Sequence, residues 1–400
     1  MAEYLNNSEL RVKSLLEFSM GIMNDENGTE LIKKHQEAID NVTPFDMVKL
    51  EDMQIQMGFE TIKIKKYVDR VINVFFSKLQ DYKWKKPEED TFLYYLMEEN
   101  KALKLKLEDI KVLVVKNDLE GNREQLLFMI KELTQVESHY VKKENILFPY
   151  LEKKLDRYRA LSVMWSIDDD VRKKIKSLIL MLEDLNTTQK EFNIEVGQFF
   201  FLIYGLIQKE DLVVYPVAAE VISDSEWEEM HMQSFEYDFA FIKTPKKREK
   251  KIFKEEIIST KESKFVIKSE TGEMTLEQAL LVFNKLPMDI TFVDEFNKVK
   301  FFSKPDDRFF PRSPAIIGRD VSNCHPPESV HIVERIVDSF KKGEKDIAQF
   351  WLSMRGKFIL IQYFALRNDL GEYKGVLEVS QDVTGIRALK GQQRLLDWED

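Results

Sequence analysis

Cysteine is nearly absent from this sequence, and histidine is scarce. The 400 residues contain one cysteine, Cys324, and five histidines. A single cysteine cannot form an internal disulfide, and it cannot supply a cysteine-rich zinc or iron–sulfur site. Five histidines spread over the chain also limit how many imidazole ligands one metal site can collect.

Long hydrophobic runs are missing as well. No uninterrupted apolar stretch reaches the roughly 20 residues of a membrane-spanning helix, and the longest candidate, Val196 to Ile207, is interrupted by Gly and Gln. The first residues, MAEYLNNSELRVKS, lack the charged-then-apolar pattern of a signal peptide. We therefore expect a cytoplasmic protein with no membrane partner.

An excess of positive charge is also lacking. The chain has 60 Lys and Arg against 70 Asp and Glu, a formal net charge of −10. Sequence-independent binding to nucleic acid rewards a basic surface. The basic run Lys243 to Lys251 has acidic surroundings and no interleaved aromatic residues, so it is interpreted as a solvated linker. No nucleic-acid partner is expected.

Catalytic motifs are the last absence. The sequence has no Gly-rich phosphate loop, no Gly-x-Ser-x-Gly elbow and no kinase signature. Its Cys and His residues have no evident third group that would orient a nucleophile pair. We therefore expect that the protein is not an enzyme.

Strand periodicity is confined to Asp289 to Val383. Apolar runs flank the polar turn Asp294 to Asn297, which predicts a hairpin. Three further strand segments follow, separated by Gly356 and by the turn Asn368 to Gly371. Between the two sets, Glu328 to Gly343 has apolar residues at helical spacing. This order predicts an α+β domain with a five-stranded antiparallel sheet and one covered face.

The same region resembles the PAS domain. The resemblance rests on FFPRSPAIIGRDVSNCHPPESVH, on the GKF before the fourth strand and on GVLEVSQDVTGIR. In the last of these, Asp382-Val383-Thr384 is close to the signature with which PAS domains hand over to an output helix. The resemblance implies a pocket between sheet and helices that holds a small ligand or a cofactor, heme and flavin among them.

Five residues of this region are candidates for binding a ligand or cofactor. The resemblance places His331 where heme-binding PAS sensors present an axial histidine. Cys324 and His325 are the alternative, a loop that ligates or senses redox state, or else a turn fixed by the prolines that follow. Arg308 and Arg312 either bind a carboxylate ligand bidentately or form surface salt bridges. The identity of the cofactor stays open, with heme as one candidate.

Residues before about 235 have the period of helices. Thr43, Pro44 and Asp46 form a helix start signal within a small helical domain. Four longer helices follow: Asp90–Lys111, Glu120–Leu155, Asp168–Gln208 and Leu212–Met230. The two longest are expected to bend or break near Lys143 and Thr187. Antiparallel packing into a four-helix bundle would bury their apolar stripes.

This bundle resembles the bacterial hemerythrin-like (HHE) cation-binding family. The resemblance rests on KENILFPY at 143–150, on KEDLVVYP at 209–216 and on VMW at 163–165. More narrowly, the chain resembles members with a helical domain of unknown function before the bundle and a PAS domain after it.

The metal site of that family looks degenerate here. A hemerythrin-type di-iron centre uses about five imidazoles and two bridging carboxylates. Only His139, Glu144 and Glu210 fall where the family's ligands would lie. Family histidine positions hold other residues: Val71, Thr91, Tyr94 and Asp168. We therefore expect no di-iron centre. His139, Glu144 and Glu210 are a residual metal site, or else His139 and Glu144 form a satisfied, partly buried pair and Glu210 is a helix-surface or capping carboxylate.

The predicted domain order follows from these patterns. It is a helical domain (1–77), a hemerythrin-like bundle (78–235), a charged linker (236–272), a PAS domain (273–387) and a C-terminal helix (388–400). Thr275 and Gln278 predict a capping box at the start of the PAS-like region. Ile386 and Leu389 begin an apolar stripe that predicts a docking or dimerising helix.

Three functional classes remain open. The favoured one is a cytoplasmic sensor or adaptor that binds a small-molecule ligand in the PAS-like domain. It would signal through a protein partner or a homodimer, with the PAS-like region and the C-terminal helix as the contact. The alternative is a metal-binding protein that handles oxygen, nitric oxide or peroxide at His139, Glu144 and Glu210. The third is a structural scaffold with a filled PAS core.

Overall fold

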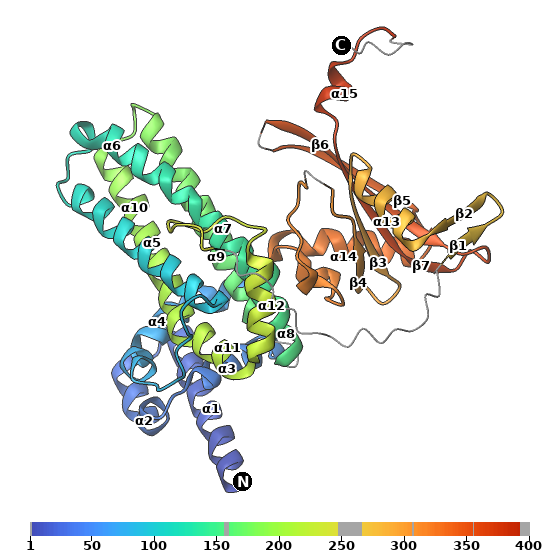
Figure 1. Cartoon of the computed structure of the whole chain (residues 1–400). Coiled ribbons are helices and arrows are strands. Elements are labelled where there is room, and N and C mark those ends of the chain that lie inside the picture. Colours follow the sequence, from blue (N-terminus) through green and yellow to red (C-terminus); the bar gives the residue numbers. More distant parts are fainter. Residues whose placement is uncertain (1, 156–159, 247–265, 306–307, 355, 393–400) are drawn as a thin grey trace. The chain divides into compact units, whose positions relative to one another are not determined.

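The chain forms two compact units that divide at residue 248 (Figure 1). The structure is a computed structural model, and it describes residues 2–155, 160–246, 266–305, 308–354 and 356–392. Within these residues, no helix combines the length and the apolar character that crossing a membrane requires. Each unit has its own hydrophobic core.

The N-terminal unit begins with four helices: α1 (Ala2–Met23), α2 (Gly28–Asp40), α3 (Pro44–Gln56) and α4 (Thr61–Gln80). The predicted start of α3 is confirmed, because Thr43 and Asp46 cap each other's backbone amides and Pro44 occupies the first turn. A buried ion pair of 2.8 Å joins Glu51 of α3 to Lys209 in the bundle. The four helices therefore belong to the same compact unit as the bundle.

The bundle consists of four long helical segments. They are α5 (Phe92–Val114); α6 (Leu119–Glu132) continued by α7 (Val136–Lys142) and α8 (Phe148–Lys154); α9 (Ala160–Glu183); and α10 (Gln189–Lys209) continued by α11 (Tyr215–Val221). α5 packs against α6 and α10, and α9 packs against the same two helices. A further helix, α12 (Asp224–Ser234), packs on α5. The predicted four-helix bundle is confirmed, but its members differ from the predicted helices. The expected helix Asp168–Gln208 forms two members, α9 and α10, and the expected fourth helix, Leu212–Met230, is divided between α11 and α12.

Two predicted helix ends are corrected. The break expected near Lys143 is a π-helical segment, Lys143–Leu147, and a second one, Glu210–Val214, joins α10 to α11 where a new helix was expected. Each precedes a proline in the next turn, Pro149 or Pro216. Because proline removes an amide and crowds the preceding turn, a wider turn lets the helix continue without a break. The break expected near Thr187 is confirmed.

The C-terminal unit is built on one sheet. After a hairpin of β1 (Val266–Ser269) and β2 (Gly272–Thr275), and α13 (Leu276–Lys285), come β3 (Asp289–Asp294), β4 (Val299–Phe302), α14 (Pro327–Lys341), β5 (Ile347–Met354), β6 (Lys357–Arg367), β7 (Tyr373–Asp382) and α15 (Thr384–Ala388). The strand order is β4-β3-β7-β6-β5, and all pairs are antiparallel. The predicted α+β sheet and the capping box at Thr275 are confirmed.

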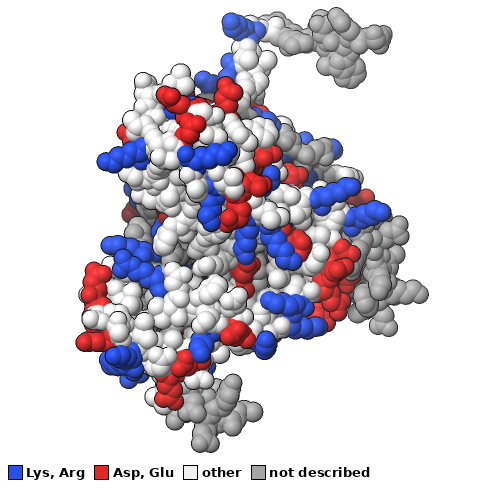
Figure 2. Space-filling view, turned by 90° about the vertical axis from the view of Figure 1, so that its left-hand side faces the viewer, with Lys and Arg blue, Asp and Glu red and all other residues white. Residues whose placement is uncertain are grey.

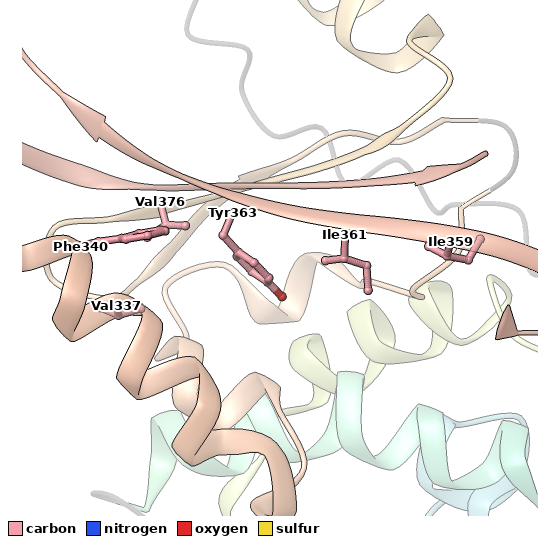
Figure 3. Close-up of a cluster of buried hydrophobic side chains, with 6 residues drawn as sticks. All are labelled: Val337, Phe340, Ile359, Ile361, Tyr363 and Val376. Atoms are coloured by element: carbon pink, nitrogen blue, oxygen red, sulfur yellow. The ribbon is translucent and has the colours of Figure 1, made fainter. Parts of the chain in front are cut away.

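Apolar side chains fill the space between α14 and the sheet. Figure 3 shows Val337 and Phe340 of α14 beside Val376 of β7 and Tyr363 of β6, with Ile361 and Ile359 farther along β6 in the same buried cluster. The strand residues alternate, so that every second side chain of β6 enters this layer. The covered face that the sequence predicts is therefore a packed core.

The predicted linker and C-terminal helix are partly outside the described residues. At the two ends of residues 236–272, Phe239 and Ala240 are buried and β1 and β2 form a hairpin. Residues 247–265 lie outside the description. For the helix expected at 388–400, α15 ends at Ala388 and residues 389–392 are not helical. Residues 393–400 lie outside the description.

Gly375 of β7 provides a test of the sheet. Its φ is +136°, and a Cβ added there would lie 2.1 Å from the backbone oxygen of Val293 on β3. We expect Gly375→Ala to destabilise the sheet by at least ~2 kcal/mol and to raise hydrogen exchange in β3 and β7. Gly385→Ala is the control, because a Cβ there meets no atom within 4 Å. Equal amide protection in the two variants would contradict this packing.

Candidate functional site

The centre of the bundle contains a cluster of charged side chains. Seven of them are at most 4% exposed: Glu99, His139, Lys142, Lys143, Glu144, Asp168 and Glu210. Arg172 reaches the same place from α9. We call these eight residues the ion cluster. Spacings of three and four residues on α7 and α9 place their charged side chains on one helix face.

His139 of α7 is held between two carboxylates. Its Nδ1 lies 2.7 Å from Oε2 of Glu99, and its Nε2 lies 3.3 Å from Oε2 of Glu210. Burial alone would lower the pKa of His139, but the hydrogen bonds to Glu210 and Glu99 raise that pKa above its usual value. Both ring nitrogens face carboxylate oxygens, an arrangement that favours the charged imidazolium. An imidazolium donates from both nitrogens and has no lone pair for a metal.

Lys143 bridges two carboxylates that come from different helices. Its Nζ donates to Oδ1 of Asp168 at 2.9 Å and to Oε1 of Glu210. Burial opposes the charge, yet Asp168 and Glu210 raise the pKa of Lys143 above its usual value. The same contacts lower the pKa of Glu210, against the effect of its burial. A charged ammonium therefore fills the space between the two acidic groups.

Lys142 forms the neighbouring ion pair with Glu99. Its Nζ donates to Oε1 of Glu99 and lies 4.0 Å from the centroid of the Phe239 ring. Oε1 of Glu99 also accepts the backbone N–H of Ala240 at 2.8 Å. Burial lowers the pKa of Lys142, and Glu99 opposes that change. The segment that follows α12 is thereby fastened to the bundle centre.

Arg172 completes the ion cluster. It donates to both carboxylate oxygens of Glu144, at 2.9 and 3.1 Å, and to Glu137 and Asp169 at the rim. Burial raises the pKa of Glu144, and Arg172 opposes that rise. The bidentate contact is the strong form of this ion pair, and it leaves Glu144 committed to Arg172.

The ion cluster does not fit a di-iron centre. Four carboxylates are matched by four cations of the chain itself: Glu99, Glu144, Asp168 and Glu210 by His139, Lys142, Lys143 and Arg172. Metal ligands must be deprotonated and available, whereas both nitrogens of this histidine face carboxylates and the carboxylates are paired with cations of the chain. In the described residues, no group of three or more His, Cys, Asp or Glu side chains is arranged to hold a metal.

The sequence located this cluster only in part. Two expectations are corrected: His139 contacts Glu210 while Glu144 faces Arg172, so the two do not pair, and Glu210 is buried and not on a helix surface. The sequence analysis missed the two lysines that neutralise the centre. A signal was present, because Lys142 and Lys143 follow His139 at helical spacings of three and four residues, and Lys143 is the first residue of the KENILFPY motif.

In the C-terminal unit, two of the five predicted residues lie near each other. Arg312 forms an ion pair of 3.6 Å with Glu378 of β7, and Glu378 accepts a hydrogen bond from Tyr363 at 3.4 Å. His325 lies close enough for Glu378 and Arg312 to influence its pKa, which burial lowers. Nδ1 of His325 lies 2.8 Å from the carbonyl oxygen of Val321. We call Arg312, His325, Tyr363 and Glu378 the polar sheet group.

Within that group, a neutral His325 is the side chain whose ring nitrogen can accept a hydrogen bond or bind a metal. A carbonyl oxygen can only accept, so Nδ1 carries the proton and Nε2 carries the lone pair. Arg312 contributes a charged donor, and its Nε has no hydrogen-bond partner within the described residues. The group therefore presents both a donor and an acceptor on the covered side of the sheet.

The other three predicted residues lie elsewhere. His331 is exposed and lies on the side of α14 away from Val337 and Phe340, so its ring does not point into the core. Cys324 packs against the small core cluster of Val293, Val299 and Ile316. Arg308 donates to the backbone oxygens of Ser303 and Phe310, which fixes its own loop. Helical phase decides the position of His331, and the sequence pattern alone did not resolve it.

Comparisons with known families agree with the two resemblances. Residues 91–218 match the hemerythrin HHE cation binding domain, and residues 280–384 match a PAS domain. A curated protein named lipoyl synthase, from Aquifex aeolicus (strain VF5), is 26% identical over 155 residues, which are 36% of this chain and 52% of that protein. The chain thus spans about half the length of that relative.

Solved structures give weaker likenesses. The C-terminal domain of a Streptococcus mutans protein is 30% identical, with 32% of this chain and 98% of that one covered and a TM-score of 0.31. A PAS domain from Colwellia psychrerythraea is 16% identical, with 28% and 98% covered and a TM-score of 0.22. A sensory box sensor histidine kinase from Vibrio cholerae is 14% identical, with 27% and 92% covered and a TM-score of 0.22.

Neutralising Glu99 tests the ion cluster. In Glu99→Gln the buried Lys142 ammonium loses its carboxylate, so we expect the free energy of unfolding to fall by about 3 kcal/mol or more. Glu98→Gln is the matched control, because Glu98 pairs with Lys101 at the surface and that variant should stay close to the unaltered chain. Urea unfolding measures both. Equal unfolding midpoints would contradict a charge-balanced centre.

Proposed function

We propose that this chain, in which a hemerythrin HHE domain precedes a PAS domain, is a cytoplasmic regulatory protein without enzymatic activity. The PAS domain binds a small polar ligand, and the bundle binds no metal and has a structural role. One observation carries the second part: the ammonium of Lys143 lies between Asp168 and Glu210, in the centre of the bundle.

The polar sheet group supports the proposal of a small polar ligand. Arg312, Tyr363 and Glu378 line the covered side of the sheet, where the guanidinium of Arg312 is only partly satisfied by a 3.6 Å ion pair. A small molecule with a carboxylate would complete the contacts of the guanidinium. Heme is the second candidate, and the lone pair of His325 favours that residue over the exposed His331 as its ligand.

Exposed apolar side chains of the C-terminal unit support signalling by protein contact. Leu281 of α13, Trp351 of β5 and Ile386 of α15 are 59%, 60% and 54% exposed. Exposed apolar groups of this size suit a protein partner or a second copy of the chain. On the face shown in Figure 2, basic and acidic side chains are interspersed, which is unlike the basic face that nucleic acid rewards.

The metal content of the full chain tests the role of the bundle. We expect protein purified from iron-supplemented cells to contain far less than one equivalent of iron, manganese or zinc, because the chain's own cations occupy the carboxylates. We also expect EDTA to leave the thermal unfolding midpoint unchanged. Stoichiometric iron with oxo-bridge absorption bands would instead support the alternative function, handling of oxygen, nitric oxide or peroxide.

Small molecules released from the denatured full chain test the PAS ligand. Mass spectrometry should detect one that is retained by the unaltered protein and lost in Arg312→Ala. Arg335→Ala is the control, because Arg335 is exposed on α14. A Soret band that is lost in His325→Ala would identify heme in place of a polar metabolite. Retention of the same molecule by Arg312→Ala would place the ligand elsewhere, and no retained molecule in any variant would favour a scaffold.

A further inference from the structure

Two polar atoms at the centre of the bundle have no hydrogen-bond partner within the described residues. They are Oδ2 of Asp168 and the hydroxyl oxygen of Tyr140. Both side chains are buried, with 0% and 1% exposed. Orphaned buried polar atoms of this kind are uncommon in folded proteins, and they frequently mark a place where a ligand or a water belongs.

Both atoms belong to the surroundings of Lys143. Its Nζ donates to the other oxygen of Asp168 at 2.9 Å, and it lies 4.6 Å from the centroid of the Tyr140 ring. The second carboxylate, Glu210, comes from another helical segment and is held in place on its far oxygen by Asn100 at 2.8 Å and by Tyr215 at 3.2 Å. Two fixed carboxylates therefore converge on one cation.

We propose that Asp168 and Glu210 form a cation site that the chain fills with the ammonium of its own Lys143, and that removal of this side chain opens the site to an external cation. The proposal rests on the proposed function, in which the bundle binds no metal. It adds that the Lys143 ammonium is the group that excludes the metal. It assigns to Lys143 a role that no metal-ligand motif of the sequence reveals.

The neighbouring Lys142 is not equivalent. Its ammonium donates to one carboxylate, Glu99, and its surroundings are the Phe239 ring and the backbone of Ala240. Removal of Lys142 would leave a single carboxylate, whereas removal of Lys143 leaves two carboxylates, Asp168 and Glu210, beside the ring of Tyr140. Lys142→Ala is therefore a matched control, because it makes the same change of charge at the adjacent residue of the chain.

The donor chemistry indicates the class of cation. Carboxylate and hydroxyl oxygens are hard ligands, which suit Mg²⁺ and Mn²⁺ with bound water in the remaining positions. The space left by the lysine side chain would accommodate such water, and it would also accept a small alkylammonium ion. Mn²⁺ is the probe of choice, because its free form is quantified by electron paramagnetic resonance.

The experiment is a Mn²⁺ titration of the full chain in three forms: unaltered, Lys143→Ala and Lys142→Ala. We expect Lys143→Ala to bind about one Mn²⁺ per chain, at least roughly tenfold more tightly than the other two forms. Adding Asp168→Ala to Lys143→Ala should abolish that binding. Methylammonium should compete with Mn²⁺ for the same site.

Several results would overturn the proposal. One is a folded Lys143→Ala variant that binds Mn²⁺ no better than Lys142→Ala, and another is binding that survives the loss of Asp168. If Lys143→Ala is recovered unfolded, its refolding yield becomes the readout. Mn²⁺ or methylammonium should restore folding and sodium at equal ionic strength should not, and failure of both cations to do so would equally overturn the proposal.

The outcome is distinguishable from that of the proposed function. Tight, stoichiometric metal binding by the unaltered chain would refute the metal-free bundle itself. Absence of binding in both the unaltered chain and folded Lys143→Ala would leave the metal-free bundle in place, and it would refute only the cation site around Lys143.

Discussion

Charge neutrality inside the bundle is the constraint on which the N-terminal unit depends. A carboxylate removed from water is costly unless a cation and hydrogen bonds replace the water. Here every buried acidic side chain of the ion cluster faces a lysine, an arginine or the imidazole of His139. Loss of any one partner leaves an uncompensated charge. The helices that contribute them, α5, α7, α9 and α10 with its π-helical continuation, are therefore tied together at their centre.

The same neutrality decides what the bundle can do. A hemerythrin-like framework with neutral imidazoles and free carboxylates would attract iron, whereas this framework supplies its own cations. Lys143 is the decisive residue, because one ammonium satisfies Asp168 and Glu210 together. The contacts of Glu99 with Lys142 and with Ala240 extend this role to the segment that leaves the bundle. The ion cluster thus occupies the place where a reactive metal would lie. It also attaches the end of the helical unit to the centre of the bundle.

The C-terminal unit is organised by apolar packing between one helix and one sheet. Alternation along β6 sends Ile359, Ile361 and Tyr363 into the layer that Val337 and Phe340 cover (Figure 3). Among these side chains, Tyr363 carries a polar group, and that group meets Glu378 beside Arg312. The polar side chains that we propose for ligand binding therefore lie within the core layer, whereas His331 lies on the surface.

The sequence by itself determined the two-part organisation, the helical bundle, the sheet and its turns, because these follow from local periodicity, caps and turn residues. It also pointed to His139 and Glu210 through the family motifs. Only the tertiary structure decided that Lys142, Lys143 and Arg172 neutralise the centre, that the helix continues through Lys143, and that His331 points outward. Those outcomes depend on which side chains from distant segments meet. They also depend on the rotation of each helix about its own axis, which residue spacing does not define. The partner of a buried charged side chain is determined only by the way the helices pack.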